Sequence, residues 1–179
     1  MDYRVVESVF TIGECNELIE QAEKIGLKES PVFNPQTKKY SMDKSKRLSA
    51  FARISNDLIL KETMGRITKK CPDVDNRLKI ITDSRVIKYI EGGYFKPHKD
   101  IIFTEGNYTG KYNMIVYLND DYKDGETCFI NSIDRTYFPV KGKIGDVLIF
   151  DPTLLHMGSE VTDGTKYILV VQLFIENEI

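Results

Sequence analysis

Turn residues break the second half of the chain at short intervals, and this pattern constrains the fold most strongly. After Pro72, short apolar or alternating runs are separated by segments rich in glycine, aspartate and asparagine. The runs are RLKIIT, SRVIKYI, YNMIVYLN, ETCFI, TYFPV, GDVLIF and KYILVVQLFI. Seven or eight short strands with such turns are typical of a β-sandwich or barrel. The pattern therefore predicts an antiparallel β-core in the C-terminal half.

The beginning of the chain predicts a strand followed by a helix. A short apolar strand is expected around residues 5–10. Thr11 and Glu14 then have the spacing of a capping box, in which each side chain satisfies a backbone N–H of the other. Apolar residues recur at helical intervals after this box, and Gly26 is expected to end the helix.

The segment SPVFNPQTKKYSMDKSK, residues 30–46, is polar and basic and contains two prolines, which predicts a loop. At this length two interpretations stay open, a solvated connection and a mobile lid over a site. The segment ISNDLILKETMGRITKKC that follows predicts a second helix, which is capped at Ser55 or Asn56.

A chain of 179 residues can bury one sizeable core, so residues 1–179 are expected to form one domain. A helical support and lid region is expected over residues 1–75 and the β-core over residues 76–179. No run approaches the roughly 20 apolar residues of a membrane span, and no signal peptide is seen, so a cytoplasmic or otherwise intracellular location is expected. The net charge of -2 argues against a nucleic-acid partner.

The chain contains two histidines, His98 in KPHKD and His156 in DPTLLHMGSEV. If His98, Asp100 and His156 converge, they form the two-histidine, one-carboxylate face that holds a non-haem Fe(II). Residues two apart in an extended strand point the same way, so His98 and Asp100 are expected to face inward while Lys99 faces out. A His-x-Asp pair taken alone is more often a surface or hydrogen-bonded feature.

The neighbouring motifs favour the metal site. Together, YIEGGYFKPHKD, MIVYLNDDYKDGETCF, GKIGDVLIFDPTLLHMG and DGTKYILVVQLF resemble the Fe(II)- and 2-oxoglutarate-dependent dioxygenases, most closely the prolyl 4-hydroxylase-like branch. The motifs cover roughly residues 85–174 and stand in the order of that family. The resemblance implies an α+β fold, in which N-terminal helices pack on a double-stranded β-helix, the jelly-roll or cupin-like core.

The resemblance also implies roles for individual residues. Lys166 matches the basic residue that pairs with the distal carboxylate of 2-oxoglutarate, and Tyr89 matches a tyrosine that lines the co-substrate pocket. Tyr117 either takes a similar inward position or is a core aromatic residue. The residues that match the iron ligands of the family are His98, Asp100 and His156.

The chemistry that the resemblance implies is hydroxylation of a side chain, with 2-oxoglutarate and O2 as co-substrates and succinate and CO2 as products. Ascorbate is the expected reductant. Asp100 favours hydroxylation, because related halogenases have a small residue in its place. Lys166 favours prolyl residues of a protein or peptide, since collagen-type prolyl 4-hydroxylases also use lysine there. A free amino acid or other small molecule is the alternative substrate, and a non-catalytic jelly-roll binding module is a further alternative.

Two segments are expected to lie nearest the substrate. One is the basic segment of residues 34–53, with Arg47 and Arg53 as candidates. The other is IIFTEGNYTGKY, which follows the predicted metal strand and contains Tyr108. An exposed loop position without a contact to substrate is the alternative interpretation for each of these side chains.

Overall fold

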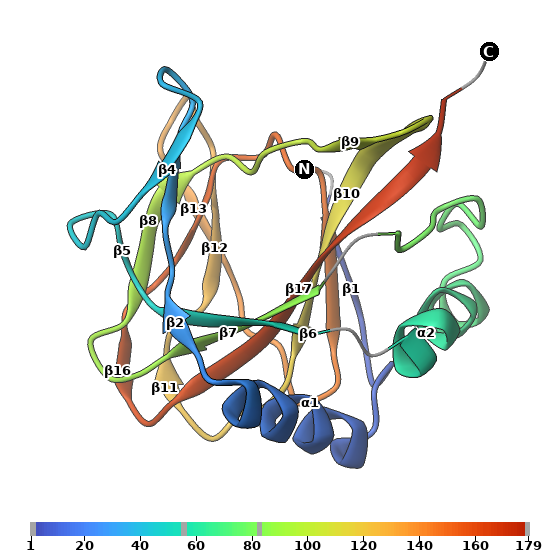
Figure 1. Ribbon diagram of the computed structural model, residues 1–179, viewed down its shortest axis with the longest axis horizontal. Helices are drawn as coiled ribbons and strands as arrows, with labels where there is room; N and C mark the ends of the chain where they lie inside the picture. The colour runs from blue at the N-terminus through green and yellow to red at the C-terminus, as the bar shows by residue number, and fades with distance from the viewer. Residues whose placement is uncertain (1–2, 55–56, 82–83, 178–179) are drawn as a thin grey trace.

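The computed structural model describes residues 3–54, 57–81 and 84–177, which form two principal β-sheets and two helices (Figure 1). The helices are α1 (Ile12–Ile25) and α2 (Asp57–Lys70). The strands of the larger sheet are β1 (Tyr3–Val6), β2 (Lys28–Glu29), β6 (Ala50–Ile54), β7 (Ser84–Tyr89), β9 (Thr104–Glu105), β10 (Tyr108–Tyr117), β14 (Val147–Phe150) and β17 (Lys166–Glu176). Their order is β1-β14-β10-β17-β7-β6-β2, with β9 beside β10.

The smaller sheet faces the larger one across the interior (Figure 1). Its strands are β5 (Arg47–Leu48), β8 (Tyr94–His98), β12 (Thr127–Ile130), β13 (Tyr137–Val140) and β15 (His156–Gly158), in the order β13-β12-β15-β8-β5. Two short pairs complete the structure: β3 (Val32–Asn34) with β4 (Lys39–Ser41), and β11 (Lys123–Asp124) with β16 (Val161–Asp163). The predicted architecture, helices packed on an antiparallel jelly-roll core, is confirmed.

The predicted capping box begins α1. The N–H of Glu14 donates to Oγ1 of Thr11, and the N–H of Thr11 donates to the carboxylate of Glu14. Gly26 ends the helix with a positive φ of 89°, a conformation that suits glycine. The cap residues expected for α2, Ser55 and Asn56, lie outside the described residues. Neither of the two described helices is both long and apolar enough to cross a membrane.

Side-chain alternation divides the apolar residues of the larger sheet between two cores. On β10, Met114 and Val116 belong to the core beneath the helices. Their neighbours Ile115 and Tyr117 belong to the core between the sheets. Both faces of the central strands are therefore buried, which explains why KYILVVQLFI is apolar without interruption.

Three local predictions differ from the structure. The first strand spans Tyr3–Val6 and not residues 5–10, because the chain turns at Ser8 (φ 52°). The run at residues 77–81 makes an isolated bridge between Lys79 and Phe174 and no regular strand. The predicted loop over residues 30–46 is wrong where β3 and β4 pair as a hairpin.

Local contacts explain the hairpin. The side-chain oxygen of Asn34 accepts hydrogen bonds from the N–H groups of Gln36 and Thr37, which closes the turn. The rings of Phe33 and Tyr40 lie 5.1 Å apart across the pair. The prolines and lysines of the segment conceal this short alternation in the sequence.

The expected division at residue 75 is also not followed by the sheets, since β1, β2 and β6 join the larger sheet and β5 joins the smaller one.

The packing of α1 on the larger sheet is tested by truncating its buried face. Leu18 is fully buried, so Leu18→Ala is expected to lower the free energy of unfolding by about 2–5 kcal/mol. Ile12 lies on the same helix with 62% of its surface exposed, so Ile12→Ala is the matched control and should change stability by less than about 0.5 kcal/mol. Urea denaturation measures both values. Equal, small changes would contradict the docking of α1 on the sheet.

Candidate active site

His98, Asp100 and His156, here called the triad, converge on one point beside the smaller sheet. His98 ends β8 and His156 begins β15, and the two are direct partners in the antiparallel register. Asp100 lies just beyond β8, where its N–H donates to the C=O of Pro152 at 2.9 Å. The strand thus ends before Asp100, unlike the single extended strand that was predicted. One potential ligand atom from each triad residue lies within 4.8 Å of the other two.

Backbone carbonyls orient both imidazole rings. Nδ1 of His98 lies 2.8 Å from the C=O of Lys96, and Nδ1 of His156 lies 2.9 Å from the C=O of Leu154. A carbonyl only accepts, so each Nδ1 carries a proton, and each Nε2 is directed at the centre of the triad, where it can present a lone pair to a metal. Both Nε2 atoms lie 3.4 Å from the carboxylate of Asp100. Lone pairs that face one another at this distance repel unless a proton or a metal ion lies between them, and the two imidazoles and one carboxylate are a ligand set that fits a divalent transition metal.

The electrostatics of Asp100 and His156 favour the protonation states in which these two residues bind metal. Burial opposes ionisation of Asp100, but the hydrogen bond with His98 and the charge interactions with both histidines lower its pKa to about 2. Burial lowers the pKa of His156, against the opposing charge of Asp100. A carboxylate and a neutral imidazole are the forms that bind metal. At neutral pH Asp100 and His156 therefore need not lose a proton before binding.

A chain of amides holds the carboxylate of Asp100. Nδ2 of Asn113 donates to Oδ2 of Asp100 at 2.5 Å, and Nε2 of Gln172 donates to Oδ1 of Asn113 at 2.8 Å. Gln172 also donates to the C=O of Ile101 and accepts from the N–H of Phe103. The sequence reasoning missed both amides. Their signal is a polar residue inside an otherwise apolar run, at buried positions of β10 and β17.

Lys166 is the first residue of β17 and pairs in register with Tyr89 of β7. Its side chain is 2% exposed, and Nζ donates to the C=O of Gly125 at 2.5 Å. Nζ lies 5.7 Å from the ring centres of Tyr89 and Tyr117 and 5.8 Å from that of Tyr122, which sequence reasoning missed. Burial lowers the pKa of the Lys166 ammonium to about 8.

The surroundings of Lys166 suit an external anion. Among the described residues, no carboxylate forms an ion pair with Lys166, and a buried ammonium without a counter-charge is costly. Tyr89 lines the cavity beside it. The hydroxyl of Tyr117 instead donates toward Thr127 (3.3 Å) and Val140 (3.4 Å), so Tyr117 contributes its ring to the enclosure of Lys166.

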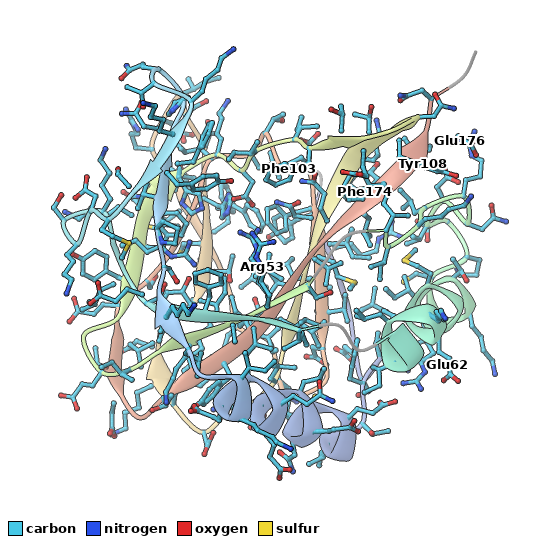
Figure 2. The ribbon with its side chains drawn as sticks, in the orientation of Figure 1. Arg53, Glu62, Phe103, Tyr108, Phe174 and Glu176 are labelled. Carbon is cyan, nitrogen blue, oxygen red and sulfur yellow. The ribbon has the colours of Figure 1, made fainter. Side chains whose placement is uncertain are left out.

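One cavity of about 1810 Å³, lined by both sheets and also by residues of α2 and of the β3–β4 hairpin, connects Lys166 with the triad. Arg47 and Arg53, two of the residues expected near the substrate, line this cavity. Tyr108, the third, is not among its described lining residues. Its hydroxyl lies 3.2 Å from Nζ of Lys79, and Figure 2 places Tyr108 near Glu176 at the end of the larger sheet.

Comparison with protein families agrees with this geometry. The family model described as the 2OG-Fe(II) oxygenase superfamily matches residues 84–173, which include the triad and Lys166. An Acanthamoeba polyphaga mimivirus protein with a prolyl 4-hydroxylase name is 28% identical over 105 residues, 48% of this chain and 42% of its own length. A PKHD-type hydroxylase of Prochlorococcus marinus (strain NATL2A) is 24% identical over 141 residues, 77% of this chain and 60% of its own length. The chain thus spans less than two thirds of these curated relatives.

Solved structures share the fold. The viral collagen prolyl hydroxylase of Paramecium Bursaria Chlorella virus-1, solved as a 2OG complex, superimposes with a TM-score of 0.68 at 23% identity. The match covers 98% of this chain and 97% of that one. At this identity the likeness shows the fold, and the triad and Lys166 provide the separate argument about the site.

Because Asn113 holds the carboxylate of Asp100, a substitution of Asn113 is expected to change the affinity for metal. Asn113→Ala removes the donor to Asp100 and is expected to weaken Mn(II) binding about 10–100-fold, as the loss of a hydrogen bond to a metal ligand commonly does. Isothermal titration of the metal-free protein measures this affinity. Asn107→Ala changes an exposed asparagine in the turn between β9 and β10 and should leave the affinity unchanged. Equal affinities for all three proteins would contradict a role of Asn113 in holding the carboxylate.

Proposed function

The chain belongs to the 2OG-Fe(II) oxygenase superfamily, and on this premise we propose that it is an Fe(II)- and 2-oxoglutarate-dependent dioxygenase that hydroxylates prolyl residues of a protein or peptide. The observation that carries the proposal is the presence of the triad and Lys166 at two points of one cavity. The names of the mimivirus relative and of the chlorella virus structure support the prolyl substrate.

In this proposal the triad holds the metal through Nε2 of His98, Nε2 of His156 and the carboxylate of Asp100. Bound Fe(II), with 2-oxoglutarate and O2, supplies the oxidative decarboxylation that yields succinate, CO2 and a hydroxylated substrate. The protein contributes ligands that are already oriented. The carbonyls behind the two imidazole rings fix their direction, and Asn113 fixes the carboxylate.

Lys166 binds the distal carboxylate of 2-oxoglutarate in this proposal. The tyrosine rings around its ammonium exclude water, which strengthens the attraction between the two charges. The hydrogen bond to the C=O of Gly125 aims the ammonium before the co-substrate arrives. Tyr89 lies beside Lys166 on the cavity wall, where it helps to position the same carboxylate.

The size of the cavity supports a peptide as the substrate. Its volume of about 1810 Å³ exceeds the roughly 300–1,000 Å³ of most small-molecule pockets. 2-Oxoglutarate occupies one end, between Lys166 and the triad. The remaining volume can accept a segment of polypeptide with the target residue directed at the metal.

Mass spectrometry of candidate substrates tests the proposal. The protein is incubated with Fe(II), 2-oxoglutarate, O2 and ascorbate, and with proline-containing peptides or free amino acids. We expect the addition of one oxygen atom to peptidyl proline, with succinate formed in parallel. His98→Ala and Asp100→Ala should abolish both products while circular dichroism shows an intact fold. Turnover retained in both variants contradicts the triad as the metal site, and oxygen incorporated into free amino acids alone favours the small-molecule alternative.

The pH dependence of co-substrate binding tests Lys166 separately. Burial lowers the pKa of Lys166 to about 8, so the ammonium form that attracts a carboxylate predominates below this pH and is lost above it. The Kd of 2-oxoglutarate is expected to rise by up to about tenfold for each pH unit above 8. Titration calorimetry with the Mn(II)-loaded protein under anaerobic conditions measures this slope.

Two variants complete this test. Lys166→Arg keeps its charge at higher pH and should flatten the pH profile. Lys166→Ala should bind 2-oxoglutarate weakly at every pH. An unchanged Kd in Lys166→Ala would show that another residue holds the distal carboxylate.

A further inference from the structure

Arg47, Arg53 and Arg85, here called the arginine cluster, line the same cavity as the triad. Arg53 of β6 and Arg85 of β7 are direct partners across the larger sheet. Arg47 belongs to β5 of the smaller sheet. Figure 2 shows Arg53 pointing into the space between the sheets. The cluster therefore brings positive charge to the cavity from both of its walls.

Strand geometry separates the cluster from Lys166. Lys166 pairs with Tyr89, and Arg85 lies four residues before Tyr89 on the same face of β7. At about 3.3 Å per residue, the Cα atoms of Arg85 and Tyr89 are about 13 Å apart. The charge of Asp100 acts on Arg85, which places Arg85 near the triad. A 2-oxoglutarate molecule that reaches from Lys166 to the triad would thus leave Arg47 and Arg85 accessible to another ligand.

Aromatic stacking fixes one member of the cluster beside the metal site. The guanidinium carbon of Arg47 lies 4.4 Å from the ring centre of Phe95, and that ring stacks on the imidazole of His98 at 3.5 Å. Nε of Arg47 donates to the hydroxyl of Ser49 at 2.7 Å. Within the described part of the chain, the terminal nitrogens of Arg47 have no hydrogen-bond partner. A guanidinium held in this way loses little further freedom when it binds an anion.

Arg85 lacks a counter-charge of its own. Burial and the positive charges of Arg47 and Arg53 lower the pKa of Arg85, while Asp100 and Tyr40 act in the opposite direction. Among residues 3–54, 57–81 and 84–177, no side chain forms a hydrogen bond or ion pair with its guanidinium. Asp100 is the carboxylate whose charge acts on Arg85, and in the proposed enzyme this carboxylate binds the metal.

The cavity as a whole has the same excess of positive charge. Among the described residues that line it, seven side chains are basic and two, Asp100 and Glu105, are acidic. The whole chain nevertheless has a net charge of -2, so the basic groups are concentrated here. Even with Lys166 assigned to 2-oxoglutarate, the excess remains. Such a surface attracts an anionic ligand.

We propose that the arginine cluster binds a carboxylate of the substrate, and that the substrate is a proline-containing peptide with an acidic residue next to the target. This inference rests on the proposed function. The planar fork of a guanidinium matches a carboxylate through two parallel hydrogen bonds, and the added charge relieves the repulsion among the three arginines. A free amino acid would offer the same chemistry through its own carboxylate.

Two labelled peptides test the cluster, one of alternating proline and glutamate and one of alternating proline and glutamine. Fluorescence anisotropy measures their binding to the full chain loaded with Mn(II) and 2-oxoglutarate, without turnover. The wild type is expected to bind the glutamate peptide at least about tenfold more tightly. Arg85→Gln should lose most of this preference, while the affinities for the glutamine peptide and for 2-oxoglutarate stay unchanged. Arg47→Gln repeats the test from the smaller sheet.

Lys88→Gln is the matched control. Lys88 lies on the same strand as Arg85 but on the opposite face, where it pairs with Glu23 at 2.8 Å. The variant removes one positive charge and should keep the preference for glutamate. Displacement of the glutamate peptide by free proline, but not by prolinamide, would support the same subsite with a small-molecule carboxylate.

Three outcomes would overturn the inference. The wild type could bind both peptides equally, or Arg85→Gln could weaken both equally. The variant could instead weaken 2-oxoglutarate or Mn(II) binding and leave the preference intact, which would assign Arg85 to the co-substrate or to Asp100. Anisotropy needs no turnover, so a failure of the proposed function appears separately, as absent succinate with the glutamate preference retained.

Discussion

The register of β17 between β10 and β7 is the constraint on which the rest of the structure depends. Side chains alternate along a strand, so Lys166 and Ile168 face the cavity. Leu169 and Val171 face the core beneath the helices. A slip of one residue would exchange the two sets, burying an ammonium among aliphatic side chains. Because both faces of β17 are buried, such a slip is strongly disfavoured, and this fixes the charge of Lys166 at the inner end of the cavity.

Features that depend on neighbouring residues, or on several family motifs in a fixed order, were predictable from the sequence. The start of α1 follows from the spacing of Thr11 and Glu14, since a capping box needs only neighbouring residues. The β-core follows from repeated turn residues between apolar runs. The convergence of the triad was predictable in another way, because the chain has two histidines and the motifs around them resemble one family. Strand alternation alone did not establish it, as Asp100 lies beyond the end of β8.

Features that depend on pairing between distant segments were not predictable. Arg85 looks like a surface residue of a half-polar strand until β6 places Arg53 beside it. Gln172 looks like a defect in an apolar run until Asn113 and the chain after β8 are seen to bind it. The β3–β4 hairpin was hidden by a composition that usually indicates a loop. In each case the missing information is which segment lies opposite, and a single sequence does not contain it.

The amide chain that ends on Asp100 crosses from one sheet to the other. Asn113 and Gln172 belong to β10 and β17 of the larger sheet, whereas Asp100 follows β8 of the smaller one. A metal held by the triad would therefore be connected to the larger sheet through the carboxylate of Asp100 and the amide of Asn113. An ion that binds the folded chain alone also shifts the unfolding equilibrium toward the folded state, in proportion to the logarithm of its concentration. The metal-loaded chain is therefore expected to resist unfolding, and cleavage by proteases, better than the metal-free chain.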